Sequence, residues 1–174
     1  LKAILQITGC RPLRIVCIWI VCLLLFAGGK GNLYSQTYFF DHYSTPQGFE
    51  SKVYTIWQDK SHYVWLGTQS GVSRFDGRTF TSWTVENGLA QGSVRVLFRD
   101  KSDVLWIGHE GGGITRFNGK SFERVTLPDT ILKSNITSIN QDTGKRLWIT
   151  TELDGALMIK NPDDAVKDLI YEHF

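Results

Sequence analysis

Short runs of alternating apolar and polar residues recur along the chain, separated by residues that favour turns. In the segment 94–126, VRVLFRD alternates, VLWIGH is a short apolar run, and GGITRFNG and SFERVT follow. Runs of this kind, closed by Asp-Gly at 76–77 and Asn-Gly at 118–119, predict antiparallel meanders of four strands. Only PDDAVKDLI, residues 162–170, admits a helical apolar period longer than two turns. The pattern therefore predicts an all-β fold.

The pattern is an internal repeat with a period of 41 to 42 residues. VWLGTQSGVSRFDG at 64–77 is followed by LWIGHEGGGITRFNG at 105–119 and by RLWITTELDGALMIK at 146–160. The third copy carries Thr150 where the first two have glycine, but it keeps the turn at Gly155. The most regular positions are a tryptophan and an aspartate in each copy: Trp65, Trp106 and Trp148, and Asp59, Asp100 and Asp142.

Four strands in about 42 residues, repeated, are typical of the blades of a β-propeller. The repeated tryptophans are expected to pack between adjacent blades, because a buried indole covers about 150–250 Å². Three blades are expected, at about 50–86, 87–128 and 129–174, preceded by an orphan outer strand at 36–49. Propellers typically have four to eight blades. The ring is therefore expected to be incomplete and the chain to be the N-terminal piece of a larger protein.

The first 35 residues have the layout of a secretory signal peptide. Three basic residues precede an apolar run of 13 residues, 15–27, which is short for a membrane span of about 20. Cleavage is expected after Ser35, and an uncleaved signal anchor is the alternative. Removing residues 1–35 takes away four of the 19 basic residues and none of the 17 acidic ones, so the mature net charge is −2. No nucleic-acid partner is expected.

Export also agrees with the cysteine positions. Cys10, Cys17 and Cys22 all precede residue 35, so the mature chain has no thiol to mispair in an oxidising compartment.

The stretch VYTIWQDKSHYVWLGTQSGVSRFDGRTFTSWTVENGLAQGSV resembles the repeat of bacterial two-component regulator propellers. The resemblance covers Thr37 to about Ile159 and is weaker in the third copy. It implies a periplasmic sensor region that continues into further blades, another β-domain, a membrane span and a histidine kinase. It also implies detection of polysaccharide fragments, and it leaves open a dimer of the full-length protein.

Two departures from the family pattern affect the expectations. The family prefers glycine three residues before the tryptophan, where this chain has His62, Asp103 and Lys145. His and Asp tolerate a left-handed backbone better than most residues, whereas Lys145 after Gly144 predicts a shifted turn. His109 replaces the expected threonine, either as a ligand contact or as drift.

The catalytic and metal motifs that this chain suggests are incomplete. HEGGG at 109–113 lacks the second histidine of a zinc protease and the nucleophilic elbow that an oxyanion loop requires, so a hairpin loop is expected. The four histidines show no metal-ligand spacing, and NPDD at 161–164 lacks the rest of a calcium loop. No catalytic residue, metal site or cofactor is expected.

Binding of a ligand by surface loops is the function that these incomplete motifs leave open. The loops TQSG (68–71), HEGGG and TELDG (151–155) are expected on one face, with ENGLAQGS (86–93) as a linking loop. The candidate ligand-facing residues are Gln69, His109, Glu110 and Glu152, because polar groups converging on one face suit an oligosaccharide or small polar ligand; solvated loop tips are the alternative. The leading function is a periplasmic ligand sensor, and the alternatives are an exported lyase-like enzyme or a non-signalling scaffold.

Overall fold

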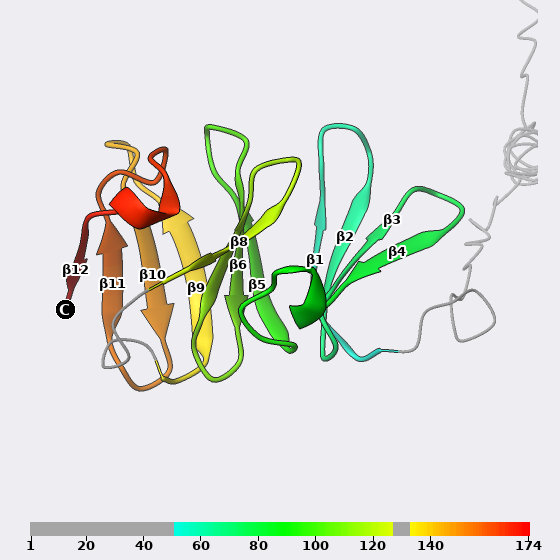
Figure 1. Ribbon diagram of the computed structural model, residues 1–174, viewed down its shortest axis with the longest axis horizontal. Coiled ribbons are helices and arrows are strands. Elements are labelled where there is room, and N and C mark those ends of the chain that lie inside the picture. The colour runs from blue at the N-terminus through cyan, green and yellow to red at the C-terminus, as the bar shows by residue number, and fades with distance from the viewer. Residues whose placement is uncertain (1–50, 127–132) are drawn as a thin grey trace, which may run out of the picture. The chain divides into compact units, whose positions relative to one another are not determined.

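The computed structural model describes residues 51–126 and 133–174, which all lie within one compact unit of the chain, His42–Phe174. Every described strand belongs to one of three four-stranded antiparallel sheets (Figure 1). The predicted signal peptide (1–35) and orphan strand (36–49) lie outside the described residues.

Each sheet takes its four strands in sequence order, as the repeat predicts. The first sheet consists of β1 (Val53–Gln58), β2 (Val64–Thr68), β3 (Val72–Phe75) and β4 (Phe80–Trp83). The second consists of β5 (Val94–Arg99), β6 (Leu105–His109), β7 (Ile114–Phe117) and β8 (Phe122–Val125). The third consists of β9 (Ile136–Gln141), β10 (Leu147–Thr151), β11 (Ala156–Ile159) and β12 (Tyr171–His173). The predicted all-β fold of four-stranded antiparallel units is confirmed.

Within residues 51–126 and 133–174, two short 3-10 turns interrupt this regularity. One, η2 (Val85–Asn87), follows β4, and its C-terminal Gly88 adopts the left-handed conformation. The other, η3 (Val166–Asp168), lies within the segment 162–170, where the apolar pattern admits a helix. That segment forms no other helical turn before β12, where Tyr171 pairs with Ile159 of β11 and the Ile170 carbonyl accepts the Lys160 N–H.

The same tight turn joins the first two strands of every sheet. In the second sheet the Asp100 carboxylate accepts hydrogen bonds from the backbone N–H groups of Ser102 and Val104, each at 2.9 Å. The Asp103 N–H donates to the Asp100 carbonyl at 3.1 Å. Aspartate recurs at this position because its short side chain can satisfy the turn's own N–H groups.

In each of these turns, the residue three positions after the aspartate has a left-handed backbone. Its φ is 67° at His62, 68° at Asp103 and 64° at Lys145. The prediction of a shifted turn at Lys145 is therefore wrong. Gly144 does not take over the position, because the Lys145 N–H must donate to the Asp142 carbonyl, as its counterparts do in the other turns.

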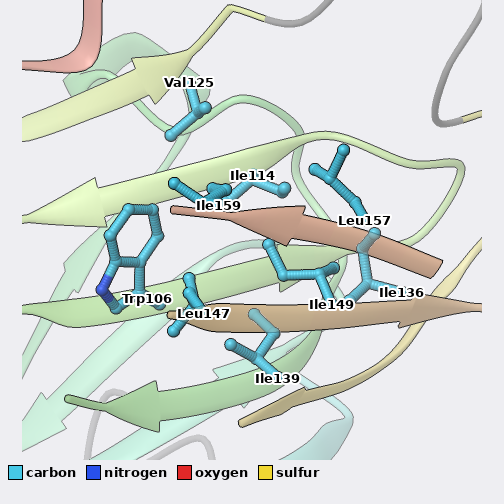
Figure 2. Close-up of a cluster of buried hydrophobic side chains, with 9 residues drawn as sticks. All are labelled: Trp106, Ile114, Val125, Ile136, Ile139, Leu147, Ile149, Leu157 and Ile159. Atoms are coloured by element: carbon cyan, nitrogen blue, oxygen red, sulfur yellow. The ribbon is translucent and has the colours of Figure 1, made fainter. Parts of the chain in front are cut away.

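The core lies between the sheets. Figure 2 shows Trp106, Ile114 and Val125 of the second sheet packed against isoleucines and leucines of the third. Trp65 of the first sheet is packed in the same way against Leu105 and Ile107 of the second. Alternate residues of a strand point to opposite faces, so the second sheet contacts the first with one face and the third with the other.

Candidate ligand-binding site

Three of the predicted loop residues occupy the same position at the same end of successive sheets. Gln69, Glu110 and Glu152 each follow the second strand of a sheet, and each donates its backbone N–H to the segment that leads into the first strand. The acceptors are the carbonyls of Lys52, Ser93 and Asn135, all at 2.9 Å. These equal bonds arise because the repeat places the same backbone geometry at each loop. Glu110 is half-buried, and the other two residues are exposed.

Glu110 is held by two side chains. Its Oε2 accepts a 2.6 Å hydrogen bond from the Ser93 hydroxyl, and it contacts Nε and Nη2 of Arg95 at 3.2 and 3.0 Å. The Ser93 hydrogen bond, with the Arg95 guanidinium, holds the pKa of the Glu110 carboxyl below its usual range. Glu110 is therefore an oriented carboxylate that can accept further hydrogen bonds.

Arg95 extends this group to the first sheet. Its guanidinium lies over the ring of Tyr54, 4.3 Å from the centroid, and the Lys52 ammonium lies 5.2 Å from the same centroid. The sequence-based interpretation missed Tyr54 and Arg95. Tyr54 and Arg95 occupy the same position of the repeat, directly after Val53 and Val94. The change from tyrosine to arginine beside an apolar position that is kept was the only sign in the sequence that these two residues have a particular role.

Asn135 joins the second loop to the third. Its Oδ1 accepts the Gly111 N–H at 2.9 Å, and its Nδ2 donates to Glu152 Oε2 at 2.7 Å. The Gln91 side chain donates to the Gly111 carbonyl at 3.1 Å. We call Tyr54, Arg95, Glu110, Asn135 and Glu152 the polar row. Cationic, anionic, amide and aromatic groups follow one another along it.

His109 has a different position from the other predicted residues. Its side chain is fully buried, with Nε2 2.8 Å from the Thr115 hydroxyl, so it does not lie with the exposed loop groups. Nδ1 makes no hydrogen bond of ordinary geometry among the described residues. Desolvation lowers the pKa of the imidazole to about 4, although the Ser93 and Gln91 backbone partly opposes this shift. His109 is therefore neutral at physiological pH.

The loop that follows His109 is a hairpin connection. Gly111, Gly112 and Gly113 have φ of 73°, 84° and 84°, a run of left-handed residues for which glycine is best suited. The His109 N–H donates to the Gly113 carbonyl at 3.2 Å, which closes the loop. Among residues 51–126 and 133–174, no group of three or more His, Cys, Asp or Glu side chains could hold a metal ion. The polar row is thus suited to hydrogen bonding and ring contact with a polar ligand.

No family model and no curated protein matches the chain. Solved structures do match. The chain is similar to the extracellular domain of a putative hybrid two-component system from B. thetaiotaomicron, with TM-score 0.56 and 23% identity. The similarity covers 77% of this chain and 17% of that one.

A second similar structure is virginiamycin B lyase from Staphylococcus aureus, with TM-score 0.57 and 17% identity over 74% of this chain and 43% of that one. This chain therefore spans less than half the length of either structure. No described helix is long and apolar enough to cross a membrane. The sheet topology and these similarities together establish the fold: the described residues form three blades of a β-propeller.

Proposed function

We propose that this chain belongs to an exported, ligand-sensing β-propeller of a two-component signalling protein. Its repeats resemble those of sensor propellers, and its blades share the fold of an extracellular two-component domain. Under this proposal residues 1–35 direct export, and the full-length protein is anchored in the inner membrane with the propeller in the periplasm. A histidine kinase then lies beyond these blades.

The polar row is the observation that carries the binding proposal. Polar groups from three successive blades meet there: Arg95 lies over the Tyr54 ring of the first blade, and the Gly111 N–H donates to Asn135 of the third. Saccharides suit such a row, because hydroxyl groups accept and donate to charged and amide side chains while an aromatic ring covers an apolar sugar face. A ligand touching several blades would also be sensitive to their relative positions, as signal transmission requires.

Titration calorimetry on the full-length protein with neutral and acidic oligosaccharides tests this proposal. Glu110→Gln removes one charge within the polar row, and Glu86→Gln removes one from an exposed position after β4. We expect Glu110→Gln to weaken binding of the responding oligosaccharide by roughly tenfold or more and Glu86→Gln to leave it unchanged. Saturable binding with equal affinity in both variants would exclude the polar row.

Signalling is tested separately from binding. Membranes containing the full-length protein should incorporate phosphate from labelled ATP at a rate that changes when the bound oligosaccharide is added. Binding without any change of rate would leave a scaffold propeller instead of a sensor.

A lyase-like function is the second candidate, favoured by the similarity to virginiamycin B lyase. A lyase that acts by elimination must remove a proton from its substrate, and the base would have to be a group other than the buried His109. Incubation with a polyuronate, followed by ultraviolet absorbance of the unsaturated product, tests this function. Turnover would replace the sensor proposal, and binding without turnover would support it.

A further inference from the structure

Arg74 and Arg116 occupy the same place in adjacent blades. Arg74 of β3 pairs with Trp65 of β2, and Arg116 of β7 pairs with Trp106 of β6. Directly paired residues project from the same face of a sheet. Both arginines therefore project from the face that carries the interblade tryptophan and that packs on the following sheet.

The guanidinium of Arg116 is fully engaged. Its Nε and Nη2 contact Glu123 Oε2 at 3.3 and 2.8 Å, and Nη1 donates to the carbonyls of Pro162, at 3.2 Å, and Asp164. Glu123 lies directly opposite Arg116 on β8, and the two carbonyls belong to the connection between β11 and β12. Only 8% of Arg116 is exposed, so its partners replace the water that it lost on folding.

Arg74 has the same place beside the tryptophan of its second strand but lacks both kinds of partner. Thr81 stands opposite it on β4, where the next blade has Glu123. The β7–β8 connection is four residues long, 118–121, whereas the β11–β12 connection that reaches Arg116 spans the eleven residues 160–170. Within the described part of the chain, the Arg74 guanidinium has no hydrogen bond and no ion pair.

Aromatic rings support the Arg74 guanidinium. Its central carbon lies 4.5 Å from the ring centroid of Tyr63, 5.5 Å from that of Trp83 and 5.6 Å from that of Trp65. Contact with ring faces stabilises the cation without using its N–H groups, which lie in the guanidinium plane. The guanidinium has five such N–H donors, and two of them can bind the two oxygens of one carboxylate in bidentate geometry.

We propose that Arg74 is an oxyanion-binding site that receives the carboxylate of a small ligand, in the place that Glu123 and the two carbonyls fill at Arg116. The site is additional to the polar row and does not depend on the signalling proposal. The tryptophans beside it make binding visible in the intrinsic fluorescence of the protein.

Two variants of the full chain test the site in different ways: one removes the Arg74 guanidinium, and the other keeps it but occupies it with a carboxylate. Arg74→Met removes the guanidinium and introduces the residue type that the third blade has at the equivalent Met158. Thr81→Glu keeps Arg74 and supplies the internal carboxylate found opposite Arg116. Arg78→Met, in the exposed turn after β3, controls for loss of one positive charge.

Fluorescence titration with glucuronate, glucose and sulfate gives the readout. We expect a saturable response to glucuronate and none to glucose in the wild type and in Arg78→Met. Arg74→Met and Thr81→Glu should weaken the glucuronate response at least about tenfold while keeping the wild-type circular dichroism spectrum. An equal response to sulfate would show that the oxyanion alone is recognised, whereas preference for glucuronate would add the sugar ring.

Three results would overturn the proposal. One is the absence of a saturable response to both glucuronate and sulfate in the wild type. Another is an undiminished response in Thr81→Glu. The third is an undiminished response in Arg74→Met, because the guanidinium would then not be the group that binds the ligand.

Discussion

The indole Nε1 of Trp106 donates a 2.7 Å hydrogen bond to Oδ2 of Asp100, the residue whose other oxygen holds the turn before β6. The same bond joins Trp65 to Asp59 at 2.9 Å and Trp148 to Asp142 at 3.1 Å. One carboxylate thus fixes both the turn and the interblade tryptophan. This explains why the two residue types recur together at a constant spacing of six.

Asp100→Ala is expected to lower the free energy of unfolding by about 2–4 kcal/mol, because it leaves the buried indole N–H and two turn N–H groups without their acceptor. Urea unfolding followed by tryptophan fluorescence measures the loss. Asp163→Ala, at an exposed position, should change stability by less than about 0.5 kcal/mol. A loss at Asp100 no greater than at Asp163 would contradict the structural role of the pair.

Burial of His109 predicts a pH-dependent stability. The unfolded imidazole binds a proton below pH 6.5, whereas burial delays protonation of the folded one to about pH 4. Between these pH values the unfolded state binds more protons than the folded state. The free energy of unfolding should therefore fall as the pH is lowered from 6.5 to 4, by up to about 3 kcal/mol. Urea unfolding at a series of pH values from 7.5 to 4.5 checks this slope.

His109→Thr places at this position the residue found at Thr68 and Thr151 in the other blades. We expect the variant to lose the His109 contribution to the pH slope, whatever its stability at neutral pH. A slope equal to that of the wild type would show that another group causes the pH dependence.

Lys145 predicts a site where glycine improves stability. A side chain at φ 64° pays a steric cost that glycine avoids, so Lys145→Gly should gain roughly 0.5–1 kcal/mol even after the added flexibility of the unfolded chain. Lys145→Ala removes the same charge but keeps Cβ, and it should show no gain. Equal thermal midpoints for the two variants would mean that the backbone conformation carries no cost.

At Gly108, in contrast, replacing glycine with alanine is expected to lower stability. A Cβ at this residue would lie 2.5 Å from Cγ2 of Ile136 in the next blade, closer than carbon atoms can approach. Gly108→Ala should therefore cost about 1–3 kcal/mol by forcing β6 and β9 apart. Gly92→Ala, whose Cβ would meet nothing closer than 3.8 Å, is the control. Chemical denaturation of both variants should separate them clearly.

The candidate site could be predicted in part. The repeat led to Gln69, Glu110 and Glu152, and the structure gives these residues identical backbone hydrogen bonds. Tyr54, Arg95 and Asn135 were not predicted, because their roles depend on contacts between blades. His109 was predicted at the loop surface, but its ring is buried beside Thr115.

By itself, the sequence determined the strands, the turns and the repeated aspartate and tryptophan, because alternation and turn hydrogen bonds act between residues close together in the chain. Only the tertiary structure decided which polar groups share a surface and which are buried. Arg74 and Arg116 have almost the same local sequence, VSRF and ITRF, yet one lies against aromatic rings and the other is enclosed by carbonyls 46 and 48 residues away. The carbonyls reach Arg116 because the β11–β12 connection of the following blade is long, and no pattern near Arg116 in the sequence contains that connection.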